Sequence, residues 1–211
     1  MTENRFAELS LTRFEERIAE RTATPGGGSV AAHAGGLGAA LCAMALRFTS
    51  GERYAAVQTS AARHASELDR LRARLSPLID ADSQAYDRVS AARKLPKNTD
   101  DEKAARTQAV QHALKGALEV PLETMGCALQ ALELMAPLAS VINPNLASDC
   151  VSGSWCLRTA VESAYLNVRI NALDITDRAF VDEKLAEADR RLARSRQLCE
   201  EIRAAAEKLM Q

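Results

Sequence analysis

The amino-acid sequence predicts an all-α protein, a bundle of long antiparallel helices that forms one domain over residues 1–211. The chain is rich in alanine and only 4% of its residues are aromatic, which favours closely packed helices over sheets. Apolar residues recur at three- and four-residue spacing along most of the chain. Because 47% of the residues are hydrophobic and 26% charged, the chain can form a packed core, which excludes a disordered protein.

The first helix is predicted to begin near residue 12. Thr12 and Glu15 have the spacing of a capping box, and Leu11 is placed to act as a hydrophobic staple. The glycine-rich turn at residues 24–29 ends this helix and begins the next.

The second helix is predicted over Val30–Leu46, with small residues at Ala32, Gly36 and Ala40 on one face. Small side chains let a neighbouring helix approach closely. This stretch is also the one candidate for a membrane span, but it is mostly Ala and Gly and contains His33. We therefore expect a helix buried in a protein core.

A long amphipathic region follows from Leu68 to Val89. Pro77 is expected to interrupt it, because Ser76-Pro77 also resembles a cap followed by a first helical position. A turn at residues 95–98 ends the region.

Thr99 and Glu102 form a second capping box, which predicts the start of another helix. Pro121 is expected to kink or restart that helix. Residues 137–148 are predicted to be an irregular loop.

Ser148-Asp149 can cap a helix that ends near Leu173, and residues 174–177 begin the last helix. That helix has a heptad-like apolar register, so we expect self-association, most simply as a homodimer.

Several classes of protein are disfavoured. A net charge of −1 argues against a nucleic-acid binder. The five cysteines lack C-x-x-C spacing and the three histidines lie far apart, so no metal site is expected. The first 20 residues lack the apolar core of a signal peptide, and we expect a cytoplasmic protein.

Asp82 is the strongest candidate for chemistry. The apolar series Leu75, Ile79, Tyr86 and Val89 lacks one member, and Asp82 is at that position. A carboxylate on a buried face must be hydrogen-bonded or have a shifted pKa, and such groups are common at functional sites. A structural ion pair would explain it equally well. Asp80 should point elsewhere.

The turn Gly26-Gly27-Gly28-Ser29 precedes a helix start, where free N–H groups can bind an anion. Such a motif is more often only a turn. Lys97 belongs to a basic patch with Arg93, Lys94 and Lys103, which taken alone resembles a solvated surface.

A second polar group comprises Asn143, Asn145, Ser148 and Asp149 with the helix behind them. Asn167 and Asn171 share one face of that helix with several small residues. This face could line a polar cavity or pack tightly against a neighbour.

These motifs together resemble the formiminotransferase-cyclodeaminase C-terminal family. The matching strings are TPGGGSVAA at residues 24–32, DADSQAY at 80–86, LPKNTDDEK at 95–103, VPL at 120–122, SD at 148–149 and NVRIN at 167–171. They follow the family's order and cover about residues 10 to 185.

The resemblance implies a metal-free homodimer without a cofactor, with tetrahydrofolate sites near the subunit interface. Its catalytic carboxylate falls in the D-x-D run, and the helical periodicity selects Asp82. The expected reaction is hydrolysis of 5,10-methenyltetrahydrofolate to 10-formyltetrahydrofolate. Formiminotetrahydrofolate cyclodeaminase activity is an alternative, and an inactive helical binding protein is a second.

In this interpretation, the polar group at residues 143–149 and Asn167 and Asn171 would hold the pterin. The glycine turn, from Gly26 to Ser29, and the basic patch around Lys97 would bind the glutamate tail of a mono- or polyglutamylated folate. Ile142, Pro144, Val151 and His33 depart from the family pattern, which affects substrate preference more than fold.

Overall fold

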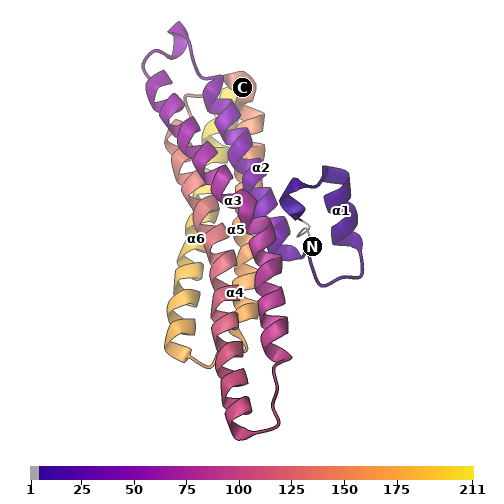
Figure 1. Ribbon diagram of the computed structural model, residues 1–211. Helices are drawn as coiled ribbons and strands as arrows, with labels where there is room; N and C mark the ends of the chain where they lie inside the picture. Colours follow the sequence, from indigo (N-terminus) through magenta and orange to yellow (C-terminus); the bar gives the residue numbers. More distant parts are fainter. Residues whose placement is uncertain (1–4) are drawn as a thin grey trace.

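A computed structural model describes residues 5–211, and this part of the chain contains six α-helices and no strand. The helices are α1 (Leu11–Ala19), α2 (Gly27–Arg47), α3 (Gln58–Arg93), α4 (Asp100–Met135), α5 (Ala147–Ala172) and α6 (Arg178–Glu207). Helices α2 to α6 run antiparallel to one another in chain order, and α1 lies beside the bundle (Figure 1). The predicted all-α antiparallel bundle is therefore confirmed.

The bundle helices differ in length, and this difference creates the site described below. Helices α3 and α4 have 36 residues each, whereas α2 has 21. Helix α2 packs against α3 and α5 in the upper half of Figure 1, while α3 and α4 extend well below its first residue. Beyond that residue, α2 no longer covers the inner face of α3.

Helix α2 packs against α5 through glycines. A Cβ atom at Gly38 would lie 2.7 Å from the carbonyl oxygen of Gly153, and one at Gly153 would lie 2.9 Å from Cys42 Sγ. Any side chain larger than hydrogen would separate the two helices at this point. The close approach expected of a small-residue helix occurs here, but at Gly38 and not on the predicted face of Ala32, Gly36 and Ala40, since a Cβ atom at Gly36 would meet nothing within 4 Å.

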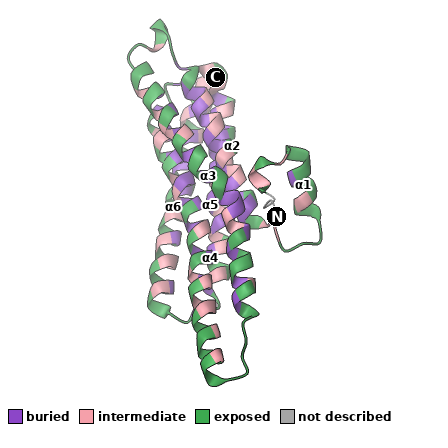
Figure 2. Cartoon of the chain, in the orientation of Figure 1, coloured by how far each residue is buried: buried purple, intermediate pink, exposed green. Residues whose placement is uncertain are grey.

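Helix α2 is also the one helix in residues 5–211 that is long and apolar enough to cross a membrane. Its mean hydropathy over 18 residues is 1.5, and 56% of that window is buried in the bundle. Much of α2 is accordingly buried in Figure 2, as expected for a core helix.

The sequence located the start of α4 and of α6, but it misplaced the caps of α1 and α5. Thr99 and Glu102 form the expected capping box at the start of α4, and Asp177 caps α6 through the Phe180 N–H. The prediction for α1 was wrong: Ser10 is the cap, and its hydroxyl accepts from the Arg13 N–H at 3.2 Å. An extended Ser10 lets the helix begin one residue before Thr12.

The cap predicted for α5, at Ser148-Asp149, was also wrong. Helix α5 is preceded by Leu146, and Ser148 and Asp149 lie inside its first turn. Asn143 instead caps a short 3-10 turn at Pro144–Leu146 by accepting from the Asn145 N–H. This turn leads directly into the helix, so no further cap is needed. The predicted loop accordingly contains two such turns, the other at Ala136–Leu138.

Neither internal proline breaks its helix. Pro77 lies within continuous α3, contrary to the expected interruption, and Pro121 lies within continuous α4, so that of the two expected outcomes, a kink or a restart, the restart does not occur. Pro121 has no N–H to give to Ala117, four residues earlier. The amide of Asn171 donates to that carbonyl at 2.9 Å, so a neighbouring helix supplies the missing hydrogen bond.

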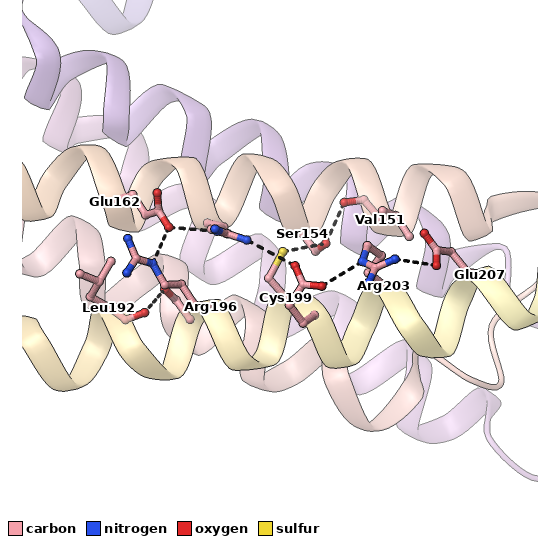
Figure 3. Close-up of polar contacts among 11 residues, drawn as sticks. Val151, Ser154, Glu162, Leu192, Arg196, Cys199, Arg203 and Glu207 are labelled. Atoms are coloured by element: carbon pink, nitrogen blue, oxygen red, sulfur yellow. Dashed lines mark hydrogen bonds and ion pairs between the residues drawn. The ribbon is translucent and has the colours of Figure 1, made fainter.

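Helix α6 is joined to α5 by a polar network along their shared edge (Figure 3). Glu162 accepts from Arg158 at 3.0 Å and from Arg196 at 2.8 Å. The hydrogen bond from Arg196 is the main cause of a lowered Glu162 pKa. Ser154 Oγ lies 3.6 Å from Cys199 Sγ beneath these charges. None of these residues lines the cavity described below, and the network links α5 to α6.

Candidate functional site

The candidate site is a cavity of about 470 Å³ at the point where α2 begins. Four parts of the chain form its walls: the turn before α2, the lower half of α3, the middle of α4 and the end of α5. The lining residues are Ala23, Thr24, Gly26, Gly27, Asp82, Tyr86, Val89, Arg93, Leu114, Ala117, Asn167, Ile170, Asn171, Leu173 and Asp174.

Asp82 lies at the boundary between the core and this cavity. Above it, Leu75 is fully buried and packs against Gly35 of α2. Below it, Tyr86 is 50% exposed and lines the cavity. The expectation that Tyr86 belongs to the core was therefore wrong, because α2 starts opposite Asp82 and does not cover the next turns of α3.

The Asp82 carboxylate is held by the first turn of α2. Its Oδ2 atom accepts from the Ser29 N–H at 3.1 Å and lies 3.3 Å from Ser29 Oγ. The Ser29 hydroxyl donates to the Ile79 carbonyl at 2.7 Å, so Ser29 joins α2 to α3 as well. The free N–H groups predicted at this turn thus include one that binds a carboxylate of the protein itself.

Two opposing effects act on the Asp82 pKa. Burial raises the pKa, because the charged form loses hydration. The Ser29 N–H and hydroxyl lower it, but the effect of burial is larger and the net direction is upward. A carboxylate with a raised pKa is a stronger base than a solvent-exposed one, which suits proton transfer near neutral pH.

Asp80 points away from this cavity, as expected. It is buried, and its carboxylate accepts from the Phe6 N–H at 2.6 Å. It therefore anchors the N-terminal segment to α3.

The glycine turn is close to α5. Gly26 and Gly27 line the cavity, and a Cβ atom at Gly27 would lie 3.4 Å from Asn167 Nδ2. Asn167 donates to the Ser163 carbonyl at 2.9 Å, and Asn171 donates to Ala117. Both asparagines line the cavity while each uses its N–H₂ group within the protein. The two interpretations left open for their face, cavity lining and tight packing, both apply.

Ser29 and Gly28 act on Asp82 and do not line the cavity. Ser29 is fully buried, so its side chain cannot reach a ligand directly. A Cβ atom at Gly28 would lie 2.0 Å from Asp82 Oδ1. These two residues were expected to bind substrate, and the structure places them behind the carboxylate.

The other predicted site residues lie away from this cavity. Asn143 contacts the far end of α2, where its N–H donates to Thr49 Oγ1 and its side chain to the Phe48 carbonyl. Helix α2 separates this end from Gly27 by about 30 Å, at 1.5 Å per residue. Asn145, Ser148 and Asp149 belong to the same end. Within one chain, the structure does not bring them to Asp82. Lys97 is exposed in the turn between α3 and α4 and does not line the cavity either.

Arg93 was named from the sequence only as a member of the basic patch around Lys97, and Asp174 was not selected at all. Arg93 Nη2 lies 2.7 Å from Asp174 Oδ2 at the rim of the cavity. The signal for Arg93 was present, because it lies eleven residues after Asp82 and therefore on the same face of α3. Asp174 could not be found this way, since it belongs to a turn after another helix.

An apolar surface lies next to the cavity on α2 and α5. Val30 and Leu37 are 37% and 47% exposed, and Leu166, Ile170 and Leu173 are 63%, 62% and 71% exposed. We call these five residues the apolar face. Large exposed apolar side chains on two helices that pack together are typical of interaction surfaces.

Residues 5–211 contain no group of three or more His, Cys, Asp or Glu side chains placed to hold a metal ion. His33, one turn into α2, packs edge-on against the Phe14 ring at a centroid distance of 5.5 Å.

Comparisons with known proteins agree with the sequence motifs. The profile of the formiminotransferase-cyclodeaminase family matches residues 10–190. A methenyltetrahydrofolate cyclohydrolase of Methylorubrum extorquens is 37% identical over 194 residues, which cover 92% of this chain and 93% of that protein. A formimidoyltransferase-cyclodeaminase of Rattus norvegicus is 37% identical over 86% of this chain, which spans only 34% of that longer protein.

A solved structure is also similar over nearly the whole chain. The crystal structure of formiminotetrahydrofolate cyclodeaminase from Thermotoga maritima has a TM-score of 0.86 and 28% identity. The match covers 97% of this chain and 98% of that one.

Proposed function

This chain belongs to the formiminotransferase-cyclodeaminase family, and from that premise we propose that it hydrolyses 5,10-methenyltetrahydrofolate to 10-formyltetrahydrofolate. The observation that carries the proposal is the partly buried Asp82 carboxylate, which Ser29 holds at the wall of the cavity. Similarity to a cyclohydrolase of almost equal length favours hydrolysis over the cyclodeaminase reaction.

In the proposed reaction, water attacks the cationic methenyl carbon that bridges N5 and N10. Asp82 accepts the proton that the attacking water loses, which leaves a neutral tetrahedral adduct. The hydroxyl proton of the adduct then moves to N5 as the C–N5 bond breaks, and Asp82 releases its proton to solvent. General base catalysis of this kind contributes about 10²–10⁴-fold to a rate. The Asp82 carboxylate also stabilises the cationic substrate. The chain's own side chains supply this chemistry without a metal or cofactor.

Formiminotetrahydrofolate cyclodeaminase activity is the second candidate, favoured by the name of the structural neighbour. There N10 attacks the formimino carbon, and ammonia leaves as 5,10-methenyltetrahydrofolate forms. The same carboxylate would move the protons. An inactive binding protein would not need a carboxylate held against a glycine at the cavity wall.

Two copies of the chain are proposed to pair through the apolar face. An antiparallel pairing about a two-fold axis would bring residues 143–149 of each copy towards the cavity of the other. The polar residues there could then hold the pterin, as the family resemblance implies, although one chain keeps them apart. Light scattering should give a dimer mass, and Leu166→Glu should give a monomer. Leu11→Glu is the matched control, since Leu11 is 65% exposed but lies on α1. A monomeric wild type would exclude this pairing.

The activity is tested by following the loss of methenyltetrahydrofolate absorbance near neutral pH. Wild type should accelerate the decay well above Asp82→Asn, which also controls for the uncatalysed reaction. Formiminotetrahydrofolate as substrate would then rank the two activities. If Asp82→Asn is folded and as fast as wild type, the assignment of Asp82 is wrong. If neither protein accelerates either reaction, the proposed function is wrong.

A further inference from the structure

We propose that Arg93 binds the glutamyl carboxylate of the folate, and that Asp174 occupies Arg93 until substrate displaces it. This assignment rests on the proposed function. It places the far end of the substrate on the same helix that carries Asp82.

The residues of α3 that line the cavity follow the order of chemical groups along a folate. Asp82, Tyr86, Val89 and Arg93 lie on one face at steps of four, three and four residues. They provide a carboxylate, an aromatic ring, an aliphatic side chain and a guanidinium. A folate carries, in line, its one-carbon centre, a flat aminobenzoyl ring and a carboxylate. With the carbon at Asp82, the ring meets Tyr86 and Val89, and the carboxylate meets Arg93.

The spacing along the helix supports this order. Eleven residues separate Asp82 from Arg93, which corresponds to about 16 Å along the axis at 1.5 Å per residue. Leu114 and Ile170 face this middle section from α4 and α5. The middle of the cavity therefore offers mainly apolar side chains beside the polar Asn171, while each end carries a charge.

Arg93 is the one cation among the residues that line this cavity, within the part of the chain the structure describes. Its guanidinium already binds a carboxylate, that of Asp174 at 2.7 Å. Both side chains are more than half exposed, at 52% and 64%, so the ion pair is open to solvent. Exposed pairs are weak, and a substrate carboxylate that is also held elsewhere in the cavity can replace Asp174.

The backbone around Asp174 is fixed, so that only its side chain needs to move. Gln111 of α4 donates to the Asp174 carbonyl at 2.9 Å and accepts from the Thr176 N–H at 2.8 Å. A second cavity of about 310 Å³ adjoins the first, and both are lined by Arg93, Leu114 and Asp174. The ion pair therefore belongs to the walls of both cavities. Displacing Asp174 opens the way towards Arg106, which lines the second cavity.

The test compares two substrates in wild type, Arg93→Gln and Asp174→Asn. One substrate is methenyltetrahydrofolate, and the other is the matching tetrahydropteroate, which lacks the glutamyl group. Arg93→Gln should raise KM for the folate roughly tenfold, the scale of one charge-assisted hydrogen bond, with kcat nearly unchanged. Asp174→Asn should lower KM severalfold, because the competing carboxylate is gone. With the pteroate, all three proteins should have the same kcat/KM.

Arg74→Gln is the matched control. Arg74 lies on the same helix and pairs with Glu123 of α4 at 3.5 Å, with exposures of 52% and 49%, but it does not line the Asp82 cavity. Its KM for both substrates should equal that of wild type. If Arg93→Gln has the wild-type KM for the folate, or weakens the pteroate equally, the assignment is overturned.

Equilibrium binding separates this inference from the proposed function. Unreactive 5-formyltetrahydrofolate, with and without its glutamyl group, is titrated into the same variants. If wild type turns over neither substrate, but the glutamyl-dependent binding seen in wild type is lost in Arg93→Gln, the proposed reaction is overturned and the inference stands. Turnover by wild type with no effect of Arg93→Gln on either assay would overturn the inference and keep the reaction. Absence of both binding and turnover would overturn both.

Discussion

Asp82 lies directly against Gly28, so that a methyl group on Gly28 would come within 2.0 Å of the Asp82 Oδ1 atom. This contact joins the start of α2 to the middle of α3 at the cavity wall. The neighbouring N–H, that of Ser29, binds the other carboxylate oxygen. The first turn of α2 therefore binds one oxygen of the carboxylate and leaves room for the other only because residue 28 is glycine.

We predict that Gly28→Ala lowers kcat by about 10²-fold or more, the scale of a lost general base. The carboxylate can rotate away from the new methyl group, so the protein should still fold. Gly36→Ala is the control in the same helix, because a Cβ atom there meets nothing within 4 Å. That variant should retain activity and gain up to about 1 kcal/mol from the higher helix propensity of alanine. Steady-state kinetics and thermal unfolding measure both effects, and full activity in Gly28→Ala would contradict the prediction.

Ser29→Ala should move the acidic limb of the pH–rate profile to higher pH. The Ser29 hydroxyl lowers the Asp82 pKa, so its removal raises that pKa further, while the N–H contribution stays. The other charged residues lining the cavity are Arg93 and Asp174, which are unchanged. Ser83→Ala is the control, since Ser83 Oγ lies 3.3 Å from Ser29 Oγ and has no hydrogen bond to Asp82. A profile of kcat/KM against pH that is the same in Ser29→Ala and wild type would refute this role.

Asp82→Asn should be more stable than wild type at neutral pH. Burial raises the Asp82 pKa above its value in the unfolded chain. At a pH between these two pKa values, the unfolded chain therefore binds fewer protons than the folded protein. Folding stability therefore falls across that interval, and the asparagine variant avoids the loss. The gain should disappear below the ordinary aspartate pKa of about 3.9, where both states are protonated. Tm measured at pH 7 and near pH 3.5 tests this, and an equal difference at both would contradict it.

Asn171→Ala should cost about 1 kcal/mol of unfolding free energy, because it leaves the Ala117 carbonyl without its donor. In a Pro121→Ala background, residue 121 regains an N–H that can bond to Ala117. The Asn171→Ala change should then cost much less. A double-mutant cycle in urea measures the coupling between the two changes. Additive effects would show that the Asn171 bond does not replace the one lost at Pro121.

Local sequence rules predicted most of the fold, because each long helix carries its own periodicity. The capping box at Thr99 and the start of the last helix after residues 174–177 depend only on neighbouring residues and were predicted correctly. The interruption predicted at Pro77 and the restart predicted at Pro121 do not occur. At Pro121 the lost hydrogen bond is replaced by Asn171, fifty residues away, and no local rule includes such a partner.

The site could be predicted only in part. Asp82 was identifiable because a helix has a fixed period and one apolar position was missing. The exposure of Tyr86 was not, because it depends on where a different helix starts. Asn143 and Lys97 share motifs with the family, yet motif order along the chain does not say which end of a 30 Å helix a residue occupies. Ser29 shows the same limit: its type suggested a ligand, whereas its burial makes it a support for Asp82.

The start of α2 partway along the bundle has a consequence for how such sites can change. The cavity exists because α2 begins partway along α3 and α4, so the length of α2 sets the size of this compartment. Inserting one helical turn before Gly27 would advance that end by about 5.4 Å and fill the space beside Tyr86. Deleting a turn would deepen the compartment but remove the residues that hold Asp82. Substrate size and catalytic geometry are thereby tied to a single insertion point, which limits how far this scaffold can drift towards larger or smaller molecules.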